Sequence, residues 1–234
     1  MKPIPRSLVF SATYNEVDNV ETLIKKINHY SPESEILIID DNSPDGTYDL
    51  LEKIQLKYDK LHLIKRKNKF GLDTAHKLAY DYALTEGFSK FITMDADLSH
   101  DPKEIPKMLE ILQGNAFVIG ARYIKGGDCD MSFYRRSISY LGNMFIKFIL
   151  QINSDEFTSS FRGFNLHLLK DFHLNKIESK GYSFFMETIY LINKLNFKII
   201  QIPIIFNNRM QGKSKMPKIE LLRTLKNVLI LFFK

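Results

Sequence analysis

Short, continuously apolar runs alternate with longer amphipathic stretches through the first half of the chain. Such runs are typical of strands covered on both faces, and the amphipathic stretches have the spacing of helices with one buried face. We expect strands at about 7–12, 35–40, 61–65, 91–94 and 117–120, and helices at about 17–30, 46–57, 72–85 and from Pro102 onward. This rhythm predicts a Rossmann-like α/β fold, in which helices flank a mostly parallel sheet.

The second half of the chain follows a less regular pattern. We expect helices at 135–151, 182–195 and 219–233, a strand at 198–206, a polar-aromatic segment at 158–165 and a basic loop at 210–216. We therefore divide the chain into a main domain, residues 1–216, and a C-terminal amphipathic helix, residues 217–234. In that helix Arg223 and Lys226 stand among Leu, Ile and Phe. This pattern fits equally a helix at a membrane interface and one packed on the core or on a partner subunit.

Polar residues follow several of the predicted strands at the point where each ends. Residues 14–16 follow the first strand, residues 40–41 end the second, residues 95–97 follow the fourth, and Arg122 follows the fifth. Open parallel sheets bind ligands at the carboxyl ends of their strands. We therefore expect these residues to converge on one rim.

The pair Asp95 and Asp97 is the first candidate for chemistry. Two carboxylates at i and i+2 of an extended chain point the same way and can share a hard divalent cation with diphosphate oxygens and water. Taken alone, such a pair is more often a turn or a helix cap. Asp40, at another strand end, is placed to accept hydrogen bonds from a base or ribose, and Tyr14 to stack on a base.

Cationic side chains form the second group of candidates. Arginine matches phosphate oxygens with two parallel hydrogen bonds, and a basic loop with a glycine, such as 209–215, could close over a diphosphate. A solvated charge run is the plainer interpretation of that loop. Glu187 is a candidate general base, and His76, His100 and His173 are interpreted as structural. The cationic candidates are Arg122, Arg135, Arg136, Arg162, Arg209, Lys213 and Lys215.

Composition narrows the class of protein. The 234 residues are 44% hydrophobic and 26% charged, which predicts a packed globular core. The net charge of +6 favours phosphorylated or anionic-lipid partners, and without tryptophan or a glycine–arginine arm we expect no nucleic-acid partner. A single cysteine, Cys129, excludes an internal disulfide framework. We see no signal peptide and no stretch long enough to span a bilayer.

Eight motifs, in this order, give the chain a resemblance to a known family: SATYNE, IIDDNSPDGT, FITMDADLSHDP, VIGARY, RRSISYLGN, TSSFRGF, GYSFFMETI and RMQGKSK. The chain resembles the family 2 inverting glycosyltransferases of the GT-A fold, and within them the polyprenol-phosphate or dolichol-phosphate mannose and glucose synthases. The resemblance covers about residues 7–216. Its most specific stretches are DDNSPDGT and DADLSHDP.

The resemblance implies a role for each motif residue. A nucleotide would be bound by Ala12, Tyr14, Glu16, Asp40, Asp41, Asp95 and Ala96. Mg²⁺ or Mn²⁺ would be held by Asp95, Asp97 and Ser99. Catalysis would rest on Asp97, Arg122, Arg135, Arg209 and Lys215. The acceptor would be bound by Arg136, Ser159, Arg162, Tyr182 and Ser214.

The sequence departs from the family pattern at three places. Ser99 stands where these synthases usually have glutamine, Gly71–Ala75 replaces a GLG-x-A motif, and Thr158–Arg162 replaces TSGFR. The changes bear on the metal contact, on the sugar and on the acceptor. They leave the nucleotide end unchanged.

The resemblance implies transfer of mannose or glucose from a GDP- or UDP-linked donor to a polyprenyl or dolichyl monophosphate, with inversion. Such a phosphate has a second pKa of about 6 and is its own nucleophile at neutral pH. The acceptor would place the protein peripherally on the cytoplasmic, inner face of a membrane. The sequence leaves open a homo-oligomer or a membrane partner subunit. It also leaves open a hydroxyl acceptor in cell-wall or capsular polysaccharide synthesis, with Glu187 as base, and a non-catalytic nucleotide-sugar-binding subunit.

Overall fold

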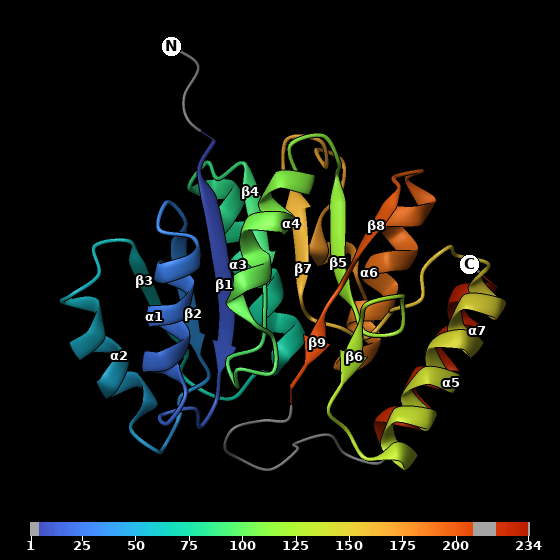
Figure 1. The fold of residues 1–234 in the computed structure, drawn as a ribbon, viewed down its shortest axis with the longest axis horizontal. Coiled ribbons are helices and arrows are strands. Elements are labelled where there is room, and N and C mark those ends of the chain that lie inside the picture. The colour runs from blue at the N-terminus through green and yellow to red at the C-terminus, as the bar shows by residue number, and fades with distance from the viewer. Residues whose placement is uncertain (1–4, 208–218, 234) are drawn as a thin grey trace.

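A seven-stranded, mostly parallel sheet forms the centre of the computed structural model, which describes residues 5–207 and 219–233 (Figure 1). The strand order is β3-β2-β1-β4-β7-β5-β8. The bounds are Ser7–Thr13 for β1, Glu35–Asp40 for β2, Leu61–Lys65 for β3, Lys90–Thr93 for β4, Phe117–Ala121 for β5, Arg162–Asn165 for β7 and Ile199–Pro203 for β8. The predicted α/β fold is confirmed.

The strand order reverses next to β1, and this reversal locates the site. The chain runs outward from β1 through β2 to β3, then crosses back to place β4 on the other side of β1. At such a switch point the connections leave in opposite directions and open a crevice at the carboxyl ends of the strands. The polar residues after β1, β2 and β4 lie at this rim.

Strand β7 is the one element of the sheet that the sequence pattern did not predict. It lies antiparallel between β4 and β5, within the segment interpreted as polar and aromatic. Its Gly163 allows close packing, because a Cβ there would lie 2.8 Å from Leu112 Cδ1 and from Val118 Cγ1. The insertion brings Ser160, just before β7, beside the end of β4.

Helices cover both faces of the sheet. On β1, Leu8 and Phe10 join the core on one face, and Val9 joins the core on the other, as alternation along a strand requires. Helices α3 and α6 contribute to the first core, and α1, α2 and α4 to the second. The bounds are Val20–Tyr30 for α1, Thr47–Gln55 for α2, Leu72–Thr85 for α3, Ile105–Ile111 for α4 and Tyr182–Lys194 for α6; the 3₁₀ turns are Pro102–Glu104 and Leu174–Lys176.

A second, two-stranded sheet corrects one predicted element. The strand expected at 198–206 is divided into β8 and β9, Ile205–Phe206, and β9 pairs in parallel with β6, Asp128–Cys129. Gly127 allows this arrangement, because a Cβ there would lie 2.6 Å from the carbonyl oxygen of Ala121. The chain between β5 and β6 therefore folds back tightly beside Arg122.

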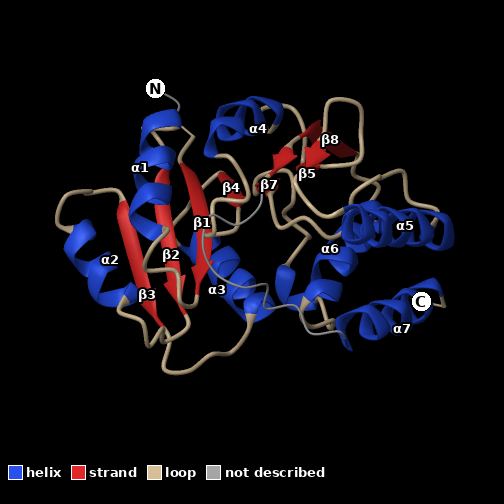
Figure 2. Cartoon of the chain, turned by 60° about the horizontal axis from the view of Figure 1, so that its bottom comes forward, coloured by secondary structure: helices blue, strands red, loops and turns tan. Residues whose placement is uncertain are grey.

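Two long helices, α5 (Phe133–Leu150) and α7 (Ile219–Phe232), lie side by side at one edge of the molecule (Figure 2). Val228 and Leu231 of α7 are buried in the core, whereas Leu229 and Phe232 are exposed. The final helix therefore packs with one face and leaves apolar side chains on another. In the described ranges 5–207 and 219–233, no helix has the length and apolarity needed to cross a bilayer.

Candidate active site

Asp95 lies just beyond β4 and is fixed from two sides. Ser160 Oγ donates a 2.6 Å hydrogen bond to Asp95 Oδ1, and the Asp95 backbone N–H donates to Nδ1 of buried His100 at 3.2 Å. Burial lowers the pKa of His100, so the ring is neutral and accepts this bond. The 3.8 Å approach of His100 Nδ1 to Asp95 Oδ2 is consequently not an ion pair. About a third of the Asp95 side chain stays exposed at the rim.

Asp97 is held by the turn that follows it. Both the backbone N–H and the Oγ of Ser99 donate to Asp97 Oδ1, at 3.1 and 2.6 Å. Leu98, between them, has φ of 62°, a region that non-glycine residues seldom occupy. Such backbone strain persists only where the surroundings enforce it, and it is common at functional sites. Ser99 is fully buried, and its hydroxyl donates a hydrogen bond to Asp97. The structure therefore supports Ser99 as the residue that orients Asp97.

The donor set at this rim fits a hard divalent cation bound together with a phosphorylated ligand. Among the described residues, no group of three or more His, Cys, Asp or Glu side chains could hold a metal by itself. Mg²⁺ in particular is usually bound by one or two carboxylates, with substrate phosphates and water as its other ligands. Asp95 and Asp97 match that pattern, and their serine hydrogen bonds orient the two carboxylates in advance.

The acidic pair at the end of β2 is more enclosed than we expected. Asp40 is fully buried and accepts hydrogen bonds from Thr13 Oγ1 at 2.8 Å and from Ser43 N and Oγ at 2.8 and 2.6 Å. Asp41 forms a buried ion pair with Arg66, a residue that the sequence analysis did not select. Both carboxylates thus organise the loops around the crevice. Nucleotide contact by Asp40 and Asp41 stays a prediction.

The segment after β1 is hydrogen-bonded to the loop after β2, because the Glu16 backbone N–H donates to Thr47 Oγ1 at 3.0 Å. Glu16 Oε2 accepts from Asn19 Nδ2 at 2.8 Å, and Ala12 and Tyr14 are half-buried. Lys69 Nζ lies 3.7 Å from the centre of the Tyr14 ring. A flat base would compete with Lys69 for that ring, whose face attracts cations. Ala96, between the two rim aspartates, is buried.

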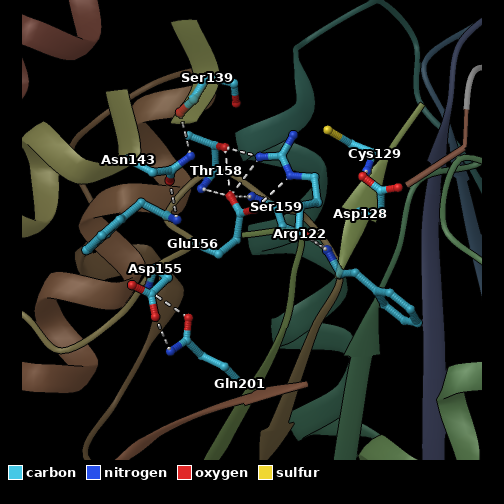
Figure 3. A network of polar contacts seen from close by, with 12 residues as sticks. Arg122, Asp128, Cys129, Ser139, Asn143, Asp155, Glu156, Thr158, Ser159 and Gln201 are labelled. Carbon is cyan, nitrogen blue, oxygen red and sulfur yellow. Dashed lines mark hydrogen bonds and ion pairs between the residues drawn. The ribbon is translucent and has the colours of Figure 1, made fainter. Parts of the chain in front are cut away.

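Arg122 lies beyond β5 in a buried network (Figure 3). Its Nε and Nη2 donate to the two carboxylate oxygens of Glu156, at 2.7 and 2.8 Å, and Nη2 also donates to Thr158 Oγ1 at 2.8 Å. Burial would lower the pKa of Arg122, but the charge and hydrogen bonds of Glu156 outweigh it and raise that pKa. Burial likewise raises the pKa of Glu156, and Arg122 more than reverses this. Both groups are therefore charged.

A cavity of about 480 Å³ opens next to Arg122, between the loop after β5 and the first half of α5. Arg136 also lines it and pairs with Asp128 at 2.8 Å. Arg135, one residue earlier on α5, is exposed. The cavity thus combines two arginines with aromatic walls, a composition suited to an anionic group attached to an apolar or sugar moiety. Its lining residues are Arg122, Tyr123, Ile124, Gly127, Phe133, Arg136, Ser137 and Tyr140.

The structure removes Arg162 from the expected acceptor residues. Its guanidinium is buried and donates to the backbone carbonyls of Ser159, Phe157 and Phe185 at 2.7–2.9 Å. Burial lowers the pKa of Arg162 to about 9. These three bonds give Arg162 a structural role. Ser159 is buried too, and its Oγ accepts from the backbone N–H of Phe161.

The remaining candidates differ in how far the structure describes them. Tyr182 begins α6 and is half-buried. Glu187, the candidate base, is buried on α6, where its Oε2 accepts from the backbone N–H of Ser179 at 2.8 Å. That position supports a structural role for its carboxylate. The basic-loop residues Arg209, Lys213, Ser214 and Lys215 lie outside the described residues.

Comparisons with known proteins agree with this geometry. The sequence profile described as Glycosyl transferase family 2 matches residues 8–172. A polyprenol monophosphomannose synthase of Mycolicibacterium smegmatis is 33% identical over 219 residues, covering 92% of this chain and 83% of that protein. An undecaprenyl-phosphate mannosyltransferase of Micrococcus luteus is 32% identical, covering 90% and 87%.

Solved structures share the fold at low sequence identity. Glucosyl-3-phosphoglycerate synthase of Mycobacterium tuberculosis, crystallised with Mn²⁺ and UDP, superposes with a TM-score of 0.68 at 14% identity, covering 98% of this chain and 80% of that one. A mannosyltransferase of Pyrobaculum calidifontis, in complex with GDP-Man and Mn²⁺, gives 0.60 at 15% identity. That comparison covers 91% of this chain, which spans 59% of the Pyrobaculum protein. The expected GT-A fold is confirmed.

Proposed function

This chain belongs to glycosyl transferase family 2, and from that premise we propose that it transfers a hexose, mannose first, from a nucleotide-diphosphate sugar to a polyprenyl monophosphate. One observation carries the proposal. A pair of oriented carboxylates at the switch point of the sheet, Asp95 and Asp97, is accompanied by a cavity lined by Arg122 and Arg136. The two relatives with about a third of their residues identical are named for mannose and for polyprenyl phosphates.

The donor would occupy the crevice beside β1 and β4. Tyr14, Glu16 and the loop held by Asp40 would bind the nucleoside of a GDP- or UDP-linked sugar, with Ala12, Asp41 and Ala96 shaping the pocket. The diphosphate would then extend toward Asp95 and Asp97. Mg²⁺ or Mn²⁺ held by these carboxylates would neutralise the charge on the departing nucleoside diphosphate. Mn²⁺ in two solved relatives of the same fold supports a divalent cation without selecting between the two.

The acceptor would enter from the arginine-lined cavity. One phosphate oxygen forms a bond to the anomeric carbon while the bond from that carbon to the diphosphate breaks on the opposite face, so the configuration inverts. The acceptor dianion needs no general base, and bringing a second anion to the site is then the main electrostatic task. The metal and Arg135, exposed on α5, would supply the positive charge for it, while Arg122 and Arg136, which line the cavity, would donate N–H groups that fix where the phosphate lies.

The apolar face of α5 and α7 suits a membrane-bound acceptor. Leu141 and Phe148 on α5 and Leu229 and Phe232 on α7 are among its exposed side chains. A helix with such a face and basic neighbours binds in the interface of an anionic membrane. We place the protein peripherally on the inner face of the membrane, with residues 217–234 as its amphipathic helix. The cavity beside α5 would then be near the lipid headgroups.

An assay of purified protein tests the proposal. GDP-mannose, GDP-glucose, UDP-glucose and UDP-mannose are each incubated with a short polyprenyl monophosphate, with Mg²⁺, with Mn²⁺ or with EDTA. We expect one donor to yield a lipid-linked sugar only when a metal is present, and mild acid to release the sugar, because a glycosyl phosphate is acid-labile. Full activity in EDTA would contradict the metal role. An acid-stable product would identify a hydroxyl acceptor, and nucleotide binding without turnover a binding subunit.

A further inference from the structure

We propose that Glu156 is a positioning residue for sugar transfer: it holds the guanidinium of Arg122 so that a single nitrogen, Nη1, faces the cavity that receives the acceptor phosphate. The inference rests on the proposed function. Within the described part of the chain, Nη1 makes no hydrogen bond, whereas Nε and Nη2 are both engaged. In Figure 3 it is the guanidinium nitrogen without a dashed line.

The carboxylate of Glu156 is itself saturated and cannot turn. Besides the two bonds from Arg122, its Oε1 accepts from the backbone N–H of Thr158 at 3.1 Å, from Thr158 Oγ1 at 3.0 Å and from the backbone N–H of Ser159 at 3.2 Å. Thr158 Oγ1 both accepts from Arg122 and donates to Glu156, which closes a triangle of bonds. A guanidinium that is hydrogen-bonded through two of its nitrogens is fixed in one orientation.

The segment that carries Glu156 is anchored to two other elements. Asn143 of α5 accepts from the backbone N–H of Phe157 at 2.8 Å, and Gln201 of β8 accepts from the backbone N–H of Asp155 at 2.8 Å. Ser154 Oγ donates to the Glu156 carbonyl at 2.8 Å. The position of Arg122 is therefore set by the sheet, by α5 and by this segment together.

Charge balance gives the arrangement its chemical meaning. Because Glu156 cancels the charge of Arg122 in the buried interior, the pair has little net attraction for anions at large. What Arg122 offers is direction, because Nε and Nη2 are engaged and Nη1 is the nitrogen left to donate to a phosphate oxygen. Arg136, paired with Asp128 at the surface, is balanced in the same way. The cavity would thus select where a phosphate oxygen sits, and binding geometry of this kind affects the transition state strongly.

Two substitutions of Glu156 test its role, and Asp155→Asn is the matched control. Glu156→Gln keeps the shape of the side chain but directs an amide N–H₂ at the arginine, so Arg122 must turn. We expect kcat/KM for a short polyprenyl phosphate to fall roughly tenfold to hundredfold, with KM for the sugar nucleotide unchanged. Glu156→Asp, which restores the charge, should recover part of the loss. Asp155→Asn removes a neighbouring charge that contacts Lys147 and Gln201 but not Arg122, keeps an oxygen that can accept from both, and should change kcat/KM less than about twofold.

Placing Glu156→Gln in an Arg122→Gln background separates positioning from a general structural effect. If Glu156 acts through Arg122, it should cost less than about twofold there. In the double variant neither partner of the Arg122–Glu156 pair is left as an unpaired charge, although Arg162 loses the nearby carboxylate, and thermal melting of every variant checks its folding. A tenfold loss in that background, or wild-type kcat/KM in Glu156→Gln, would overturn the inference.

Direct binding keeps this inference distinguishable from the proposed function. Calorimetry with geranyl monophosphate should show about tenfold weaker binding to Glu156→Gln than to the wild type. Glu156-dependent binding without turnover would reject the proposed function and retain the positioning role. Turnover with equal binding and equal kcat/KM in both proteins would do the reverse. No binding to the wild type would overturn the inference, because the cavity would then take no phosphate monoester.

Discussion

The two halves of the candidate site differ in how most of their charged groups are held. At the ends of β2 and β4, carboxylates accept hydrogen bonds from neutral donors: Asp40 from Thr13 and Ser43, and Asp97 from Ser99. Hydrogen bonds from neutral groups orient a carboxylate without cancelling its charge. We expect Asp95 and Asp97 to supply the negative charge for a cation, whereas Asp41, at the end of β2, is already paired with Arg66.

Beyond β5 two cations are already balanced, because Arg122 pairs with Glu156 and Arg136 pairs with Asp128. Arg162 is held by neutral backbone carbonyls, which fix its position without cancelling its charge. A compensated cation contributes position more than net charge. The contrast indicates that the acidic half binds through charge, whereas the basic half determines where its ligand lies.

The largest effect should follow from removing charge in the acidic half. Asp97→Asn keeps the hydrogen bonds to Ser99 but reduces the metal affinity, and we expect kcat to fall roughly 10³-fold or more. Asp101→Asn, four residues on, is the control: Asp101 caps the Pro102–Glu104 turn through Lys103 N, and asparagine caps equally well. Initial rates over a range of Mn²⁺ and Mg²⁺ concentrations measure both variants. If Asp97→Asn and Asp101→Asn behave alike, Asp97 holds no metal.

A stability measurement sharpens the comparison in the basic half. Arg162→Met leaves three buried carbonyls without their donor, and we expect it to lower the free energy of unfolding by about 3–5 kcal/mol. Arg136→Met removes one half-exposed ion pair and should cost under about 1 kcal/mol. Urea denaturation monitored by circular dichroism compares the two. Equal losses would show that burial does not distinguish these arginines.

The pH dependence of stability tests the contact between α3 and α6, where the ring of His76 of α3 packs against Phe184 and Phe185 of α6. Burial lowers the pKa of His76 from 6.5 to about 4. As the pH falls below 6.5 the unfolded chain gains a proton that the folded protein resists, so stability falls until about pH 4. The shift corresponds to about 3 kcal/mol. His76→Gln should remove this part of the slope, measured by urea denaturation from pH 8 to pH 4.

The control for the pH experiment is His29→Gln, on the exposed side of α1. It should leave the slope between pH 6.5 and pH 4 as in the wild type. If His76→Gln also leaves that slope unchanged, the seam between α3 and α6 opens to water, and His76 is protonated without cost to the fold.

The sequence predicted the acidic half better than the basic one, for physical reasons. The sequences of β1, β2, β4 and β5 are apolar on both faces, so these strands and their ends could be located from the sequence. Asp40, Asp95 and Asp97 lie at or just beyond those ends. Strand β7 has the sequence RGFN, whose Arg162 and Gly163 are not typical of a buried strand. The buried arginine fits because three backbone carbonyls accept its hydrogen bonds. The glycine fits because Leu112 and Val118 leave no room for a Cβ at this position.

Glu156 was missed for a related reason. Its partner Arg122 lies 34 residues away, and no local pattern links the two. The local signal is weak, because two adjacent acidic residues, Asp155 and Glu156, precede a hydroxyl-rich run and nothing in the pattern distinguishes the one that pairs with Arg122. Pairings of this kind follow from the three-dimensional arrangement of β5, β8 and α5. Sequence reasoning therefore selected Arg122 and Asp41 but missed the residues that pair with them, Glu156 and Arg66.

The smallest expected effect is on membrane binding. It compares an exposed leucine in the second half of the chain with one in the first half. Leu141 of α5 is 62% exposed on the apolar face of the second half, and Leu56, at the end of α2 in the first half, is 87% exposed. If the second half alone faces the bilayer, Leu141→Ser should weaken binding to phosphatidylglycerol–phosphatidylcholine vesicles about threefold to fivefold, or about 1 kcal/mol. Leu56→Ser should leave binding unchanged, although it removes the more exposed leucine. Co-sedimentation over a lipid titration measures both. Equal weakening would mean that the protein has no preferred face, and no measurable vesicle binding by the wild type would place the apolar surface of α5 against another protein.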